Sequence, residues 1–138
     1  MRISIVTYSI KIGGVETVLR TLAEQFSLSG HGVEIIEVFR PGEWRSEFVK
    51  AGLSVRACFQ GGLQSQVGHA RKIARILEGY DAVFLNDVPV VNAVLGLLDC
   101  STARIAIVHS NMISMLRNGL ANLEELDYVV GVSPLAGC

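Results

Sequence analysis

Two adjacent glycines, Gly13 and Gly14, lie between a short apolar run and an amphipathic stretch that begins at Val15. A strand, a glycine turn and a helix N-terminus in this order form a site for an anion, because the first amides of a helix have no internal partner and the helix dipole adds positive potential there. Glycines lack a Cβ and let a phosphate approach the backbone closely. The pair predicts either a nucleotide or sugar-phosphate site, or simply a tight turn.

Polar side chains follow two later apolar runs. His109 ends one of them, beside Ser110 and Asn111, and Asn86 and Asp87 end another. A histidine there can donate a hydrogen bond to a sugar hydroxyl or act as an acid or base, or its ring can merely bond to neighbouring backbone. Asn86 and Asp87 either bind hydroxyls or cap the helix that follows.

Other residues are interpreted more simply. Tyr8, directly after the first strand, is a further candidate for contact with a sugar. Glu16 lies in the first turn of a helix, where a carboxylate favours the dipole, and His69 near another helix start is expected to be solvated. No two histidines have metal-ligand spacing and the 3 cysteines form no CxxC, so neither a metal site nor a disulfide framework is expected.

The elements that position these residues are read from hydrophobic periodicity. Apolar runs predict strands at 3–7, 33–39, 53–58, 81–86, 103–108 and 127–132. Helical patterns lie between them: one begins at Val15, and the others cover 43–51, 66–78, 90–98 and 112–126. Strands that alternate with helices predict an α/β fold, a Rossmann-like doubly wound parallel sheet of about six strands in a single three-layer domain. Ligands of such sheets bind at the carboxyl ends of the strands, where the residues above lie.

The composition bounds the class of protein. A length of 138 residues suits one domain, and 50% hydrophobic against 18% charged residues excludes disorder. The net charge of −1 gives no electrostatic reason to expect nucleic acid, so no nucleic acid partner is expected. Unpaired cysteines and the lack of a signal peptide or membrane span favour the cytoplasm, with peripheral membrane association left open.

A nicotinamide cofactor is one alternative. Glu37 ends the second strand, where an acid that binds the ribose would lie. The glycines, however, do not have the GxGxxG spacing of dinucleotide-binding folds, and no P-loop motif occurs. An NAD(P)-dependent enzyme therefore stays an alternative that only one of its two features supports.

Two segments together resemble a known family. The segment 13–16 directly after the first strand, followed by 30–35 leading into the second, resembles the N-terminal domain of GT-B glycosyltransferases, and more narrowly the retaining family 4. The segments 108–110 and 127–133 look like later landmarks of that domain. The resemblance covers nearly the whole chain. It implies that 1–138 is the acceptor-side, N-terminal Rossmann-like domain and that the C-terminal donor-binding domain is absent.

The resemblance also implies roles for the site residues. Gly13 and Gly14 would contact the diphosphate of a UDP- or GDP-sugar donor, the catalytic His109 would face the donor sugar, and Ser110 and Asn111 would line the acceptor side. The chain would then be the acceptor-binding half of a retaining transferase, inactive alone, with no cofactor besides its donor substrate. A glycan, a lipid-linked or a small-molecule acceptor and self-association through the exposed cleft face are expected. One departure is that Asn86-Asp87 replaces a histidine that family members often carry.

A second alternative comes from a different class of protein. The chain would be a stand-alone Rossmann-like module that binds a nucleotide or a sugar phosphate without catalysis.

Overall fold

The computed structural model describes residues 1–99, 101–109 and 113–131. Within them, 6 strands form one sheet in the order β3-β2-β1-β4-β5-β6, and every neighbouring pair is parallel. Strand order reverses between β1 and β4, which defines the doubly wound Rossmann-like arrangement and confirms the predicted α/β class. The strands are β1 (Arg2–Thr7), β2 (Gly32–Glu37), β3 (Ser54–Ala57), β4 (Ala82–Asn86), β5 (Ala103–Val108) and β6 (Tyr128–Gly131).

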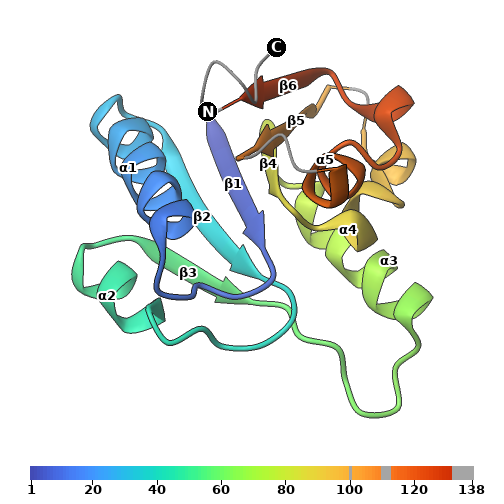
Figure 1. Ribbon diagram of the computed structural model, residues 1–138, viewed down its shortest axis with the longest axis horizontal. Coiled ribbons are helices and arrows are strands. Elements are labelled where there is room, and N and C mark those ends of the chain that lie inside the picture. Colours follow the sequence, from blue (N-terminus) through green and yellow to red (C-terminus); the bar gives the residue numbers. More distant parts are fainter. Residues whose placement is uncertain (100, 110–112, 132–138) are drawn as a thin grey trace.

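Helices cover both faces of the sheet. Figure 1 shows α1 and α2 on one side of the strands and α3 and α4 on the other, which gives the three predicted layers. No helix among the described residues is long and apolar enough to cross a membrane. The helices are α1 (Gly14–Leu28), α2 (Arg45–Lys50), α3 (Gln66–Leu77), α4 (Pro89–Asn92) and α5 (Ile113–Gly119).

The core lies on both faces because successive side chains of a strand point to opposite sides. Ile5 and Val6 of β1 are both fully buried. Ile5 belongs to the cluster that contains Leu19 of α1, whereas Val6 belongs to the cluster that contains Ile73 of α3. The continuous apolar runs of the sequence therefore reflect a sheet that is covered twice.

Two helices are shorter than the sequence predicts. In place of the helix expected at 90–98, α4 ends at Asn92 and a 3-10 turn follows at Leu95–Leu97. In place of the helix expected at 112–126, α5 ends at Gly119 and a 3-10 turn covers Leu123–Glu125. The other elements differ from the predicted ones by one or two residues at their ends.

A buried asparagine explains both interruptions. The Asn92 side-chain amide is fully buried and donates to the carbonyls of Gly119 and Ala121, at 3.2 and 2.8 Å. In return, Asn122, which has a left-handed φ of 55°, donates from its side chain to the Asn92 carbonyl at 2.8 Å. These bonds satisfy carbonyls that end the helices and join the two segments.

Candidate functional site

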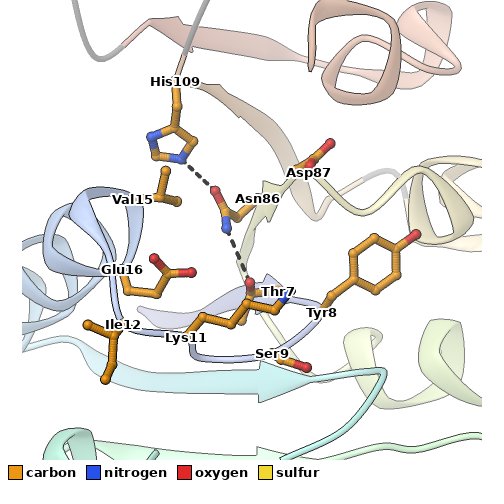
Figure 2. Close-up of a pocket in the computed structure, with 10 residues that line it drawn as sticks. All are labelled: Thr7, Tyr8, Ser9, Lys11, Ile12, Val15, Glu16, Asn86, Asp87 and His109. Carbon is orange, nitrogen blue, oxygen red and sulfur yellow. Dashed lines mark hydrogen bonds between the residues drawn. The ribbon is translucent and has the colours of Figure 1, made fainter. Parts of the chain in front are cut away.

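The carboxyl ends of the central strands lie in register at the point where strand order reverses. Thr7 at the end of β1 pairs with Asn86 of β4 on one side and with Glu37 of β2 on the other. A cavity of about 300 Å³ opens above this point, as Figure 2 shows. We call it the switch-point cavity. It is lined by Thr7, Tyr8, Ser9, Lys11, Ile12, Val15, Glu16, Asn86, Asp87 and His109.

A chain of hydrogen bonds crosses the floor of this cavity. The Asn86 side-chain amide donates to the hydroxyl of Thr7 at 3.1 Å, and the Asn86 Oδ1 lies 2.5 Å from Nε2 of His109. Because Oδ1 can only accept, Nε2 of His109 is the donor. In the neutral imidazole the other nitrogen, Nδ1, is then the proton acceptor. Two residues predicted from separate strands, Asn86 and His109, are thus brought into direct contact (Figure 2).

The surroundings of His109 favour its neutral form. Burial lowers the pKa of His109 below the ordinary value of 6.5, and the charges of Glu16 and Asp87 oppose this shift without cancelling it. The imidazole is therefore uncharged at neutral pH, with a basic nitrogen that can receive a proton. The sequence interpretation of Glu16 as chiefly a partner of the helix dipole missed its proximity to His109.

Asp87 has an unusual backbone that directs its side chain. Its φ of 52° lies in the left-handed region, which aspartate adopts more readily than most residues. The Asp87 Oδ1 is buried and has no hydrogen-bond partner among the described residues. Val88, not Asn86 or Asp87, is the N-cap of α4, and no side chain bonds to that helix end. The capping alternative is therefore wrong, and Asp87 instead lines the cavity.

The two glycines begin α1 just before Val15 and Glu16, which line the cavity, and are not themselves among its lining residues. Gly13 is the N-cap, Gly14 is the first helical residue, and no side chain among the described residues caps the first amides. A Cβ on Gly14 would meet nothing within 4 Å, whereas one on Gly13 would lie 3.1 Å from a carboxylate oxygen of Glu16. Contacts with the described residues therefore do not require glycine at position 14.

The remaining predicted residues are more scattered. The Tyr8 side chain points away from His109 in Figure 2. The pKa of Tyr8 is raised, mainly because its side chain is partly buried.

Ser110 and Asn111 lie outside the described residues, as does the expected helix start at Ser133-Pro134. Among the described residues, no group of three or more histidine, cysteine, aspartate or glutamate side chains is placed to hold a metal ion.

Glu37 is fully buried and occupied by the protein itself. Its Oε2 accepts from the backbone N–H of Ile10 at 2.9 Å and of Gly42 at 2.7 Å, and its Oε1 lies 3.3 Å from the guanidinium of Arg45. A carboxylate in this position is unable to bind a ribose. The alternative of an NAD(P)-dependent enzyme therefore loses the residue that supported it.

His69 is buried as well, against the expectation of a solvated residue. Only 6% of its surface is exposed, and Nε2 donates to the carbonyl of Cys58 at 2.7 Å. His69 begins the buried face of α3, which continues with Ala70 and Ile73, and its ring lies against the chain that follows β3. The signal that could have predicted this burial is the helical periodicity of α3, which places His69 on the same face as Ile73 and Leu77.

Comparisons with known proteins identify the fold of the chain. No protein-family model and no curated protein matches the chain. An alpha-glucosyltransferase in complex with UDP and a 13-mer DNA containing a HMU base matches with a TM-score of 0.69 and 17% identity, over 95% of this chain and 37% of its own. The chain has a glycosyltransferase-like fold. At this identity the likeness concerns the fold alone, and the chain spans about a third of the enzyme's length.

Two further structures carry the same fold. An alpha-glucosyltransferase with UDP-glucose and DNA containing an abasic site matches with a TM-score of 0.68 and 18% identity, over 96% of this chain and 36% of its own. One with UDP and a 13-mer DNA containing a central A:G mismatch matches with a TM-score of 0.70 and 16% identity, over 97% and 37%.

The DNA in these structures corrects one expectation. The net charge of −1 predicts that nucleic acid is not a partner. That prediction is wrong, because proteins that share this glycosyltransferase-like fold are solved in complex with DNA. The physical reason is that a nucleic acid responds to the local distribution of charge and not to the sum over the whole chain.

Proposed function

We propose that this chain is the acceptor-side, N-terminal half of a retaining glycosyltransferase that uses a UDP- or GDP-sugar and is inactive by itself. The observation that carries the proposal is the switch-point cavity, which brings the uncapped start of α1 and the neutral His109 to one space. The glycosyltransferase-like fold supports it. So does the chain's span of about a third of the UDP-bound neighbours, which leaves room for a donor-binding half.

The glycine side of the cavity suits the leaving diphosphate. Negative charge grows on that group as the bond to the sugar breaks, and fixed amides stabilise it without reorganising. The first amides of α1 have no side-chain cap, and Lys11 adds a cation to the same cavity. A diphosphate could approach Gly14 closely, since no Cβ intervenes.

The opposite side of the cavity suits the acceptor. The basic Nδ1 of His109 can receive the proton of an acceptor hydroxyl as that hydroxyl attacks the sugar. Asp87 lines the same cavity, and its charge acts on the imidazole of His109. Retention requires the new bond to form on the face of the sugar from which the diphosphate leaves. His109 and the first turn of α1 (Val15 and Glu16) line a single cavity, which suits attack on that face. Among acceptors, nucleic acid now stands beside glycans, lipid-linked sugars and small molecules.

Replacement of Gly14 by valine tests the donor contact. With the ¹⁵N-labelled chain, we expect UDP-glucose at millimolar concentration to shift the amide signals of Gly14, Val15 and Glu16, and NAD to leave them unchanged. Gly14→Val should abolish these shifts because its side chain fills the space over the amides, although its Cβ meets no described atom within 4 Å.

Gly62→Val is the matched control. A Cβ added at Gly62 would also meet nothing within 4 Å, but this glycine lies in a loop outside the switch-point cavity. The variant should keep the shifts caused by UDP-glucose. Shifts that persist in Gly14→Val would mean that the two glycines form only a turn.

A further inference from the structure

A second, larger cavity lies on the other side of Tyr8 from His109. Its volume is about 560 Å³, within the range of small-molecule sites. Tyr8 lines both cavities, so the two lie next to one another. We call it the aromatic cavity. It is lined by Tyr8, Val38, Phe39, Gln60, Gly61, Gly62, Gln66, His69 and Val90.

An exposed aromatic ring stands at this cavity. Phe39 lies two residues after the end of β2, and its side chain is 63% exposed. Tyr8 holds it edge-on, with 6.3 Å between ring centroids and 80° between planes. The guanidinium of Arg40 lies 5.6 Å from the Phe39 centroid. A ring and a guanidinium held in this way form a platform on which a flat ring can stack.

Arg40, which lies against Phe39, brings one positive charge to the edge of the aromatic cavity. No carboxylate is among its lining residues, whereas the switch-point cavity contains Glu16 and Asp87. A third, smaller cavity beyond Ser9 is lined by Lys11 and Arg40 together with Glu43. An anionic ligand is therefore favoured over a neutral one.

Side-chain amides complete the recognition chemistry. Gln66 begins α3 at the edge of the cavity, and Gln60 is held in place by a bond from its amide nitrogen to the carbonyl of Gln64 at 2.6 Å. Amide groups pair well with the donor and acceptor edges of bases. Sugar hydroxyls would instead be held most strongly by carboxylate acceptors, which this cavity does not have.

We propose that the aromatic cavity binds a base of single-stranded nucleic acid, which stacks on Phe39 while its phosphate lies along Arg40. The strand then passes Tyr8 and places the next nucleotide in the switch-point cavity. The proposal deepens the proposed function, because it names nucleic acid as the class of acceptor. Binding at the aromatic cavity does not itself depend on sugar transfer.

Fluorescence anisotropy of a labelled ten-nucleotide DNA strand tests this proposal at low salt. We expect the intact chain to bind it and Phe39→Ala to raise the Kd about 5- to 100-fold, which corresponds to one lost stacking contact. Phe39→Leu should weaken binding similarly, because it keeps the apolar surface but not the ring, and Phe39→Trp should restore it. Leu28→Ala, at a side chain that is 81% exposed at the end of α1, is the matched control and should bind normally.

Competition separates the possible ligands. Unlabelled DNA should displace the labelled strand, whereas dextran sulfate of equal charge and maltoheptaose should displace it far less. Absence of DNA binding, equal Kd values for Phe39→Ala and Leu28→Ala, or equal displacement by either competitor would overturn the proposal. The UDP-glucose shifts at Gly14 are measured separately, so failure of donor binding with intact Phe39-dependent DNA binding would overturn the proposed function alone.

Discussion

We expect His109→Ala to lower the rate of sugar transfer about 100-fold or more when the chain acts together with the proposed donor-binding half. Alanine removes the nitrogen that receives the proton of the acceptor hydroxyl, whereas the amides at Gly14 are untouched. The loss should therefore fall on kcat, with little change in the KM for the donor. Release of UDP from UDP-glucose in the presence of acceptor measures both constants.

Two variants make this prediction specific. His31→Ala is the matched control, because His31 lies at the amino end of the sheet, where Nδ1 is 3.2 Å from the N-terminal amine, and transfer should be unchanged. His109→Gln keeps a side chain that can donate to Asn86 but provides no base. If glutamine restored the rate, His109 would act only through its hydrogen bond to Asn86.

The pH profile gives a further test of the base. Since the neutral imidazole is the active form, the rate should fall as pH drops through the His109 pKa, which lies below 6.5 because the ring is buried. Above that pKa the rate should be constant. Asn86→Asp places a carboxylate against Nε2, favours the imidazolium and should move this fall in rate to higher pH. A purely structural role of His109 would leave the position of the fall unchanged.

The fold and the location of the site follow from sequence periodicity. Apolar runs predict the strands because both faces of the sheet are covered, and parallel strands place their carboxyl ends at one edge. This rule alone brings Asn86 and His109 to one place, without any knowledge of their contact. The rule does not predict the tautomer of His109. The tautomer depends on the Asn86 side chain, which donates its amide N–H to Thr7 and so presents its oxygen to His109.

Other features depend on contacts between distant segments. Asn92 ends two predicted helices through bonds to carbonyls 27 and 29 residues away, which no local pattern contains. Glu37 matches the position of a ribose-binding acid, yet its carboxylate turns inward to backbone amides. The polarity of His69 predicts solvent, whereas the buried face of α3 determines its environment. Each of these three polar side chains bonds to the protein's own backbone, whereas its residue type alone predicts that it faces solvent or a ligand.

Replacement of Glu37 by alanine should reduce the free energy of unfolding by about 3–5 kcal/mol. Two backbone N–H groups, one of them at the buried Ile10, would lose their acceptor, and Arg45 would lose its partner. Urea unfolding followed by circular dichroism measures the loss. Glu47→Ala, which removes a carboxylate 48% exposed in an ion pair with Lys50, is the matched control and should change stability by less than about 0.5 kcal/mol.

Glu37→Gln separates the charge of this residue from its hydrogen bonds. Glutamine keeps an oxygen for the N–H groups of Ile10 and Gly42 but loses the attraction to Arg45, so we expect a smaller loss, with both amides still protected from hydrogen exchange. These two amides join the loops after β1 and β2, which approach so closely that a Cβ on Gly42 would lie 2.0 Å from the Ile10 carbonyl oxygen. The loop after β1 leads to the glycines, so Glu37 positions the proposed diphosphate contact without touching the ligand. Glu37→Gln should consequently retain the UDP-glucose shifts at Gly14, and a variant that kept full stability but lost those shifts would instead place the carboxylate in donor binding itself.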